Sequence, residues 1–279
     1  MAGGELVTKI AREKNLPILP VDSEHSAIFQ CMQFPSTLWA LRHPKVEGCP
    51  SRAGWSLRSN RPQRIILTAS GGAFFGKTRA ELEHATVKDA LQHPVWDMGA
   101  KITVDSATMF NKGLEVIEAA WLFDLDVSKI DVLIHRQSIV HSLVEYCDGA
   151  VLAQLGLPSM CLPIQYALTY PNREASPSPR LDLAKLGTLT FEAPRHEDFP
   201  AINLCKMAWE LGGTAPAALN GANEAANELF RAGKLRFLDI AHFVEQAMHT
   251  VPNSAADNLD NIFAADQAAR QKVVCLSQP

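Results

Sequence analysis

Paired cysteines, long apolar runs and an excess of charge of one sign are all missing from this sequence. The six cysteines show no C-x-x-C pair and no Cys/His cluster, which argues against a zinc site or a disulfide scaffold and suits a reducing compartment. No apolar stretch approaches the ~20 residues of a membrane span, and no signal peptide is recognisable. We therefore expect a soluble intracellular protein. The cysteines are Cys31, Cys49, Cys147, Cys161, Cys205 and Cys275.

Charge also limits the choice of partner. With 26 basic and 30 acidic residues the net charge is -4, so nothing in the overall balance favours nucleic acid or a membrane. The stretch 41–62 is rich in Arg, Pro, Gly and Ser and is predicted to be a long loop. Its basic residues lack interleaved aromatics apart from Trp55, which favours a solvated insertion over a nucleic-acid patch. The basic residues in and beside it are Arg42, Lys45, Arg52, Arg58, Arg61 and Arg64.

The order of the apolar patterns predicts an α/β (α+β) domain followed by an all-α C-terminal bundle. We expect a domain over 1–170, a proline-rich linker over 171–200 and a helical domain over 201–279. Strand-like runs occur at Ile18–Val21, Arg64–Thr68, Val132–Ile134 and Val151–Leu155. Helical patterns that stop at Gly or Pro cover Ala201–Leu211, Pro216–Arg231, Phe237–Thr250 and Ala255–Val273.

Two carboxylates follow the first of these runs. Asp22 and Glu24 are two positions apart, so on extended chain both would point the same way into one cleft. Two oxygens placed like this form half of a site for a hard cation. The alternative is that they cap the helix expected from Ser26 to Met32.

A second group of polar residues lies between 102 and 118. Ile102–Val104 is predicted to end a strand, and Asp105 or Ser106 to cap the helix that follows. A helix N-terminus with Ser106 can seat a phosphate. On that helix Asn111, Lys112 and Glu115 share a face, and Glu115 could add a third carboxylate to a metal held by Asp22 and Glu24. The alternative is a solvated face with an ordinary surface ion pair.

The strand at 64–68 breaks into a Ser70-Gly71-Gly72 turn, whose amides can form an anion-binding nest. The residues Gly71–Thr78 also match the P-loop pattern G-x-x-x-x-G-K-[ST], which leaves a nucleotide-binding protein as an alternative. Bulky Phe74 and Phe75, and the lack of a strand ending in a Walker-B aspartate, weaken that reading.

The segment 93–99 carries His93, Trp96 and Met98 and contains Pro94 and Gly99. Such a segment could be a lid that closes over a small substrate. The alternative is a structural histidine with core aromatic and Met side chains.

These motifs together resemble the 1-deoxy-D-xylulose-5-phosphate reductoisomerase family over about residues 6–250. The resemblance rests on long motifs in a fixed order, and further matches lie at Gln137–Ser142, Leu155–Pro158, Leu219–Asn220 and Ala222–Glu224. The main motifs are Pro-Val-Asp-Ser-Glu-His-Ser-Ala-Ile-Phe-Gln, Leu-Thr-Ala-Ser-Gly-Gly, His-Pro-x-Trp-x-Met-Gly-x-Lys-Ile and Val-Asp-Ser-Ala-Thr-Met-x-Asn-Lys-Gly-Leu-Glu.

The resemblance implies a role for each matching residue. Asp22, Glu24 and Glu115 would bind Mg2+ or Mn2+, Glu24, His93 and Lys112 would be catalytic, and Gly99 would contact NADPH. The metal would polarise the substrate carbonyl for isomerisation, and NADPH would then reduce the aldehyde to 2-C-methyl-D-erythritol 4-phosphate, an isoprenoid precursor of the non-mevalonate pathway. The substrate-binding set would be Ser23, Glu24, Ser70, His93, Trp96, Met98, Ser106, Asn111, Lys112 and Glu115.

The departures from the family pattern lead to further expectations. Family members begin with a Rossmann-type NADPH-binding domain that has no counterpart here, so we expect an incomplete chain unable to transfer hydride by itself. Asp97 in the lid and Arg136 replace uncharged residues, and Asp97 adds negative charge near a phosphorylated substrate. The family implies a homodimer formed through the sheet, in the bacterial cytoplasm or plastid stroma. A non-catalytic dimerising remnant is the remaining alternative.

Overall fold

The computed structural model describes residues 1–33 and 62–278, which form two compact units. Unit 1 consists of Met1–Ile18, Ala69–Ser138 and Thr188–Pro279, and unit 2 of Leu19–Thr68 and Ile139–Gly187. Most of the predicted loop over 41–62, with its basic residues up to Arg61, lies outside the described residues. The predicted domain limits at 170 and 200 stay a prediction.

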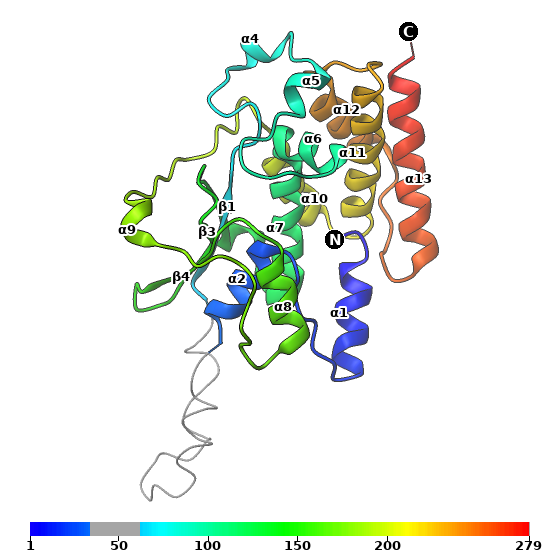
Figure 1. The fold of residues 1–279 in the computed structure, drawn as a ribbon. Helices are drawn as coiled ribbons and strands as arrows, with labels where there is room; N and C mark the ends of the chain where they lie inside the picture. The colour runs from blue at the N-terminus through cyan, green and yellow to red at the C-terminus, as the bar shows by residue number, and fades with distance from the viewer. Residues whose placement is uncertain (34–61, 279) are drawn as a thin grey trace, which may run out of the picture. The chain divides into compact units, whose positions relative to one another are not determined.

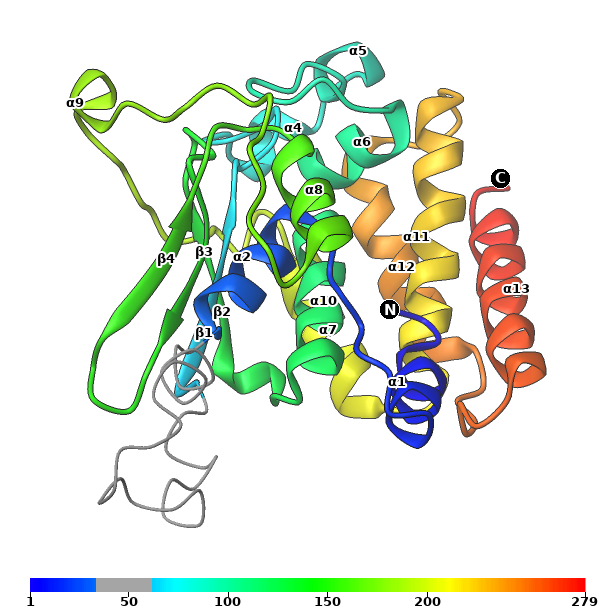
Figure 2. The same cartoon turned by 60° about the horizontal axis from the view of Figure 1, so that its bottom comes forward.

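Unit 2 is built on antiparallel strands that pair in the order β1-β3-β4, covered by helices. The register places Arg64 opposite Glu145 and Leu143 opposite Ala153. Helix α2 packs against β3 and β4, and α8 packs against α2 (Figure 2). The elements are α2 (Ser23–Cys31), β1 (Arg64–Ala69), β3 (Val140–Glu145), β4 (Val151–Leu155), α8 (Cys161–Thr169) and α9 (Leu183–Leu186).

The first part of unit 1 centres on α7, which packs against α1 and α10. Trp121 on α7 and Trp209 on α10 meet edge to face with ring centroids 4.8 Å apart. Such aromatic pairs bury large apolar areas and fix the angle between helices. The elements here are α1 (Gly4–Glu13), α4 (Arg79–Leu82), α5 (Val87–Ala90), α6 (Ala100–Thr108), α7 (Phe110–Phe123), the 3-10 turn η2 (Val127–Lys129) and β2 (Ile130–Ile134).

The rest of unit 1 is helical, with α11 packed against α10, α12 and α13 (Figure 1). Buried alanines on α11, such as Ala218, Ala222 and Ala226, let the neighbouring helices approach closely. The prediction of an α-helical C-terminal region is confirmed. The helices are α10 (Ala201–Leu211), α11 (Ala215–Arg231), α12 (Phe237–Thr250) and α13 (Leu259–Leu276).

Two strand predictions are wrong. Residues 18–21 form neither strand nor helix, and 102–104 lie inside α6. In α6 the β-branched Thr103 and Val104 are buried by packing, which overrides their preference for strands. The strands predicted at 64–68, 132–134 and 151–155 are confirmed.

The proline-rich stretch is partly held by unit 1. Glu192 forms a bridge with Ile134 at the end of β2, and the His135 ring stacks on Phe191 with centroids 4.7 Å apart. The His135 ring also hydrogen-bonds the Thr190 carbonyl at 2.8 Å, so this histidine has a structural role. No helix within the described ranges is long and apolar enough to cross a membrane.

Candidate functional site

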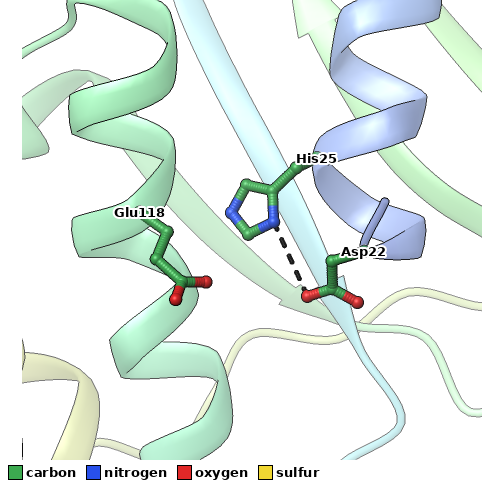
Figure 3. Close-up of side chains that lie close together, drawn as sticks. All are labelled: Asp22, His25 and Glu118. Carbon is green, nitrogen blue, oxygen red and sulfur yellow. Dashed lines mark ion pairs between the residues drawn. The ribbon is translucent and has the colours of Figure 1, made fainter. Parts of the chain in front are cut away.

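Asp22, Ser23 and Glu24 lie in unit 2 at the N-terminus of α2. Asp22 is the N-cap of this helix, and its Oδ1 accepts a hydrogen bond from the Ser23 amide at 2.9 Å. The Ser23 hydroxyl donates to Glu24, and Nδ1 of the buried His25 lies 3.6 Å from Asp22 Oδ2 (Figure 3). The predicted extended geometry is wrong, because Glu24 is already helical. The capping interpretation is confirmed for Asp22, whose side chain is 46% exposed and so keeps oxygen surface for a cation.

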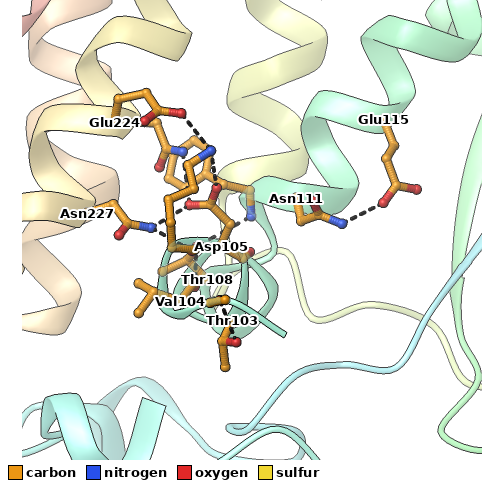
Figure 4. Close-up of polar contacts among 12 residues, drawn as sticks. Thr103, Val104, Asp105, Thr108, Asn111, Glu115, Glu224 and Asn227 are labelled. Carbon is orange, nitrogen blue, oxygen red and sulfur yellow. Dashed lines mark hydrogen bonds and ion pairs between the residues drawn. The ribbon is translucent and has the colours of Figure 1, made fainter. Parts of the chain in front are cut away.

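Asn111, Lys112 and Glu115 lie on α7 in unit 1. The sequence suggested one helix starting near 105, but Met109, at φ +67°, separates α6 from α7 and puts Asn111 and Lys112 in the first turn of α7. Asn111 Nδ2 donates to Glu115 Oε1 at 2.6 Å, and Lys112 Nζ to Oε2 at 2.6 Å (Figure 4 shows the Asn111 contact).

The Lys112–Glu115 pair is buried: the exposed fraction of the surface is 4% for Lys112 and 3% for Glu115. The solvated surface pair considered from the sequence is therefore wrong. A buried ion pair is costly to desolvate and contributes little net stability, and such pairs occur both in structural networks and at functional sites.

The Ser70-Gly71-Gly72 turn packs on α6 in unit 1. Gly71 and Gly72 have φ of +85° and +65°, which only glycine adopts without strain. A Cβ on Gly72 would lie 2.5 Å from the carbonyl oxygen of Ser106. Only a glycine therefore lets this turn approach the backbone at Ser106. The turn brings two of the predicted phosphate-binding segments together.

His93 holds Ser70 through a defined tautomer. Its Nδ1 accepts hydrogen bonds from the amides of Trp96 at 2.8 Å and Val95 at 3.2 Å, so Nδ1 carries no proton. Its Nε2 lies 2.8 Å from Ser70 Oγ and must donate there, while the Gly72 amide donates to the same oxygen at 3.2 Å. Ser70 Oγ thus accepts two bonds, and its own proton is free to be donated.

This arrangement also excludes a serine-nucleophile dyad at Ser70. A histidine that donates from Nε2 cannot take the serine proton as a general base. Burial lowers the pKa of His93 and favours the same neutral ring. The pair is therefore suited to presenting a hydroxyl proton to an anion.

The predicted lid residues form non-helical chain ahead of α6. Trp96 and Met98 are half-buried, and Asp97 is exposed. Gly99 is the N-cap of α6, and its carbonyl accepts from Thr103 Oγ1 at 2.9 Å. The segment is anchored at both ends, by the Trp96 amide on His93 and by Gly99 on α6.

The local structure does not support the P-loop alternative. The helix after Thr78 has only four residues and is closed by a capping box between Thr78 and Glu81. Lys77, which would bind phosphate in a P-loop, pairs with Glu81 at 3.1 Å.

A polar cluster around Asp105 was missed by the sequence reasoning. Asn223 and Asn227 on α11 donate to this buried carboxylate, and Lys101 pairs with it (Figure 4). The signal was present, because Asp105 and Asn223 both belong to motifs that carry the family resemblance. Their contact spans 118 residues, so no local pattern could reveal it.

Family models, related sequences and solved structures all point to one family. Two family models match, described as the "DXP reductoisomerase C-terminal domain" over residues 155–272 and the "1-deoxy-D-xylulose 5-phosphate reductoisomerase C-terminal domain" over residues 18–123. A reductoisomerase from Synechococcus sp. is 51% identical over 278 residues, covering 100% of this chain and 65% of the relative. A reductoisomerase from Exiguobacterium sibiricum is 48% identical over 278 residues, which cover 99% of this chain and 67% of the relative.

Solved structures agree. A crystal structure of DOX-P reductoisomerase in complex with NADPH, fosmidomycin and magnesium matches with a TM-score of 0.85 and 42% identity, covering 99% of this chain and 68% of that one. The chain belongs to the 1-deoxy-D-xylulose 5-phosphate reductoisomerase family. The reductoisomerase from Zymomonas mobilis in complex with NADPH matches this family member with a TM-score of 0.86 and 41% identity over 99% of the chain. The chain spans about 65% of the length of the curated relatives, which continue beyond the matched part.

Proposed function

We propose that this chain supplies the metal- and phosphate-binding part of a 1-deoxy-D-xylulose-5-phosphate reductoisomerase. The overall reaction would be metal-dependent isomerisation of the sugar phosphate followed by NADPH-dependent reduction to 2-C-methyl-D-erythritol 4-phosphate. The observation that carries the proposal is the Ser70 turn packed on Ser106, with His93 leaving the Ser70 proton free for an anion. Family membership supplies the identity of the substrate.

The phosphate of the substrate would be held by unit 1. Ser70 would donate its hydroxyl proton, and the positive-φ Gly71-Gly72 turn would add amide donors. Lys112, in the first turn of α7, would supply positive charge together with the partial charge of the helix N-terminus. Ser106 and Asn111 would complete the set.

A divalent cation would be held by Asp22, Glu24 and Glu115. The donor set fits, because carboxylate oxygens are the ligands that Mg2+ and Mn2+ prefer. Asn111 and Lys112 each donate to Glu115, one to each oxygen, which holds this carboxylate in a fixed orientation. When bound, the ion would polarise the substrate carbonyl. Lys112 would keep the Glu115 carboxylate ionised and oriented, and the Ser23 hydroxyl would do the same for Glu24.

The cofactor and the oligomeric state complete the proposal. Two related solved structures are complexes with NADPH, and we assign Gly99 to the cofactor contact at the edge of the lid. We also propose a homodimer formed through the sheet of unit 2, in a bacterial cytoplasm or plastid stroma. In the described part of the chain β4 lies at the end of its sheet with Val151 and Leu152 exposed, which leaves an edge that a second copy could cover.

Calorimetric titration with 1-deoxy-D-xylulose 5-phosphate, with and without Mn2+, tests the proposal. We expect manganese-dependent binding that Glu115→Ala weakens by about 100-fold or more, because loss of a ligand should cost at least as much as loss of an outer-shell partner. Glu210→Gln, which alters an exposed carboxylate on α10, is the matched control and should bind as wild type.

The outcomes separate the alternatives. Manganese-dependent binding lost only in the Glu115 variant supports the proposed site. Absence of any binding by wild-type chain with an intact thermal transition would overturn it for this chain and favour the non-catalytic remnant. Binding of ATP that depends on Lys77 would favour the P-loop alternative.

A further inference from the structure

Residues from separate sequence motifs that themselves have no role in the proposed chemistry meet at Asp105. This residue is on α6 and is 1% exposed. Its Oδ1 accepts hydrogen bonds from Asn223 Nδ2 at 3.0 Å and Asn227 Nδ2 at 2.8 Å, both on α11. Its Oδ2 lies 2.8 Å from Nζ of Lys101, one turn earlier on α6 (Figure 4).

Only an ionised carboxylate satisfies this arrangement. Within the described residues, the three side chains that hydrogen-bond or pair with Asp105 are all donors, so both of its oxygens accept. Asn223 Oδ1 is buried and has no hydrogen-bond partner within the described part of the chain. Turning the amide over would place that carbonyl against the carboxylate. The orientation of Asn223 that donates to Asp105 therefore leaves its carbonyl without a partner in the described residues, although burying such a group costs free energy.

The same cluster fixes the whole of α6 on α11. Lys101 Nζ also lies 2.6 Å from Glu224 Oε1, and the Lys101 carbonyl accepts from Asn227 Nδ2 at 3.0 Å. Two successive turns of α6 are therefore tied to α11. Burial lowers the pKa of Lys101, but Asp105 and Glu224 outweigh it and raise the pKa, so the ammonium stays charged.

Ser106 follows Asp105 directly and is the residue on which the Ser70 turn rests. A shift or rotation of α6 would move the Ser106 backbone against Gly72, where there is no room for even one extra carbon. Misplacement of binding groups by about 1 Å is enough to cost a large part of their effect. The position of α6 thus decides whether the two serines converge.

We infer that Asp105 is a positioning residue that locks α6 onto α11 through Asn223, Asn227 and Lys101, and so holds Ser106 beside the Ser70 turn. This inference rests on the proposed function, because it concerns the phosphate end of that site. It predicts that phosphate affinity depends on a carboxylate–amide lock outside the binding residues.

The test compares Asp105→Asn with the reciprocal double variant Asp105→Asn/Asn227→Asp, which returns one carboxylate and one amide to the lock. Asp239→Asn, at an exposed ion pair at the start of α12, is the matched control. The readouts are affinity for 1-deoxy-D-xylulose 5-phosphate, affinity for Mn2+ alone, and hydrogen exchange of the α6 amides.

We expect Asp105→Asn to bind the sugar phosphate about tenfold more weakly, the equivalent of about 1.4 kcal/mol, with Mn2+ affinity unchanged. The α6 amides should exchange faster, and the double variant should recover both properties in part. A folded Asp105→Asn variant with wild-type affinity and exchange would overturn the inference. If that variant does not fold, Asn227→Ala, which removes one donor, is judged by the same readouts.

Failure of the proposed function is distinguishable from failure of the inference. If wild-type chain binds no sugar phosphate, the proposed function fails. Hydrogen exchange then still tests whether Asp105 locks α6 onto α11. Unchanged exchange of the α6 amides in Asp105→Asn would overturn this inference, and faster exchange confined to α6 would support it.

Discussion

His93 connects a local hydrogen-bond pattern with the charge state of the site. Two backbone amides point at its Nδ1, so protonation would set an N–H against two N–H donors. Burial lowers its pKa from 6.5 for a second reason, the loss of solvation of the cation. Both effects keep the ring neutral at pH 7 and keep the Nε2 proton on Ser70.

The predicted pH dependence follows from this lowered pKa. Between the folded pKa and 6.5 the unfolded chain binds more protons than the folded one, so the free energy of unfolding rises with pH. The contribution of His93 is complete above about pH 6.5 and is lost as pH falls below it. Urea unfolding between pH 5 and 8 should show this, and His93→Gln should show a smaller slope. The wild-type-minus-variant difference removes the contribution of His196, whose pKa is also lowered by burial.

Nitrogen-15 NMR of the imidazole tests the tautomer directly. We expect signals of a ring protonated on Nε2 at pH 7.5. A proton on Nδ1, or an imidazolium at that pH, would contradict the assignment and with it the free Ser70 proton.

The turn between β1 and α4 requires glycine at position 72 for two separate reasons. Gly72 needs both its positive φ and its missing Cβ, whereas Gly76, at φ +79°, has open space around it. Gly72→Ala should therefore lower the free energy of unfolding by about 2–4 kcal/mol, from backbone strain plus overpacking. Gly76→Ala should cost only the strain, about 1 kcal/mol.

Urea unfolding of the two variants gives both values. Sugar-phosphate binding adds a functional readout, because only the Gly72 variant pushes the Ser70 turn away from Ser106. Equal destabilisation by the two substitutions would show that the turn does not rest on α6.

Prediction from sequence succeeded for elements whose limits are set by neighbours in the chain. Helices α10 and α12 have the predicted ends, because Gly212 and Pro252 stop them locally. α13 begins at 259 rather than 255, since Asn258 caps it by accepting from the Asn261 amide at 2.8 Å. The predicted strand at 102–104 failed because packing of α6 outweighed local propensity.

In the candidate site, too, contacts between near neighbours in the chain could be predicted and contacts between distant residues could not. The shared face of Asn111, Lys112 and Glu115 follows from helical spacing and is confirmed by the hydrogen bonds on Glu115. The Ser70–His93 bond and the Asp105 lock join residues far apart in the chain. Only motif resemblance could suggest that such residues act together, and it could not supply their donor and acceptor roles.

At the scale of the whole molecule, each unit combines segments that are distant in the sequence. Unit 1 gathers α1, the Ala69–Ser138 region and the C-terminal helices, while unit 2 gathers α2, the strands β3 and β4 and most of β1. The residues assigned to phosphate lie in unit 1, and Asp22, Ser23 and Glu24 lie in unit 2. The proposed function therefore draws on residues of both units, and the matched family regions, 18–123 and 155–272, include residues of both.

The exposed edge of unit 2 leads to a prediction about assembly. In β4, Val151 and Leu152 are 47% and 44% exposed, and among the described residues no strand pairs with the edge of β4 that lies away from β3. Proteins rarely leave such an edge bare, because it pairs readily with other strands. We expect a dimer of twice 30.5 kDa in sedimentation velocity, and we expect Leu152→Lys to shift it to monomer by placing a charge on the covered apolar face.

Leu259→Lys is the matched control, because it makes the same change at an exposed leucine on α13, 58% exposed, in unit 1. It should sediment as wild type. A wild-type monomer would refute the dimer itself. A dimer that persists in Leu152→Lys would place the interface away from β4. An unpaired lysine buried between two copies should destabilise the dimer by more free energy than the leucine contacts contribute.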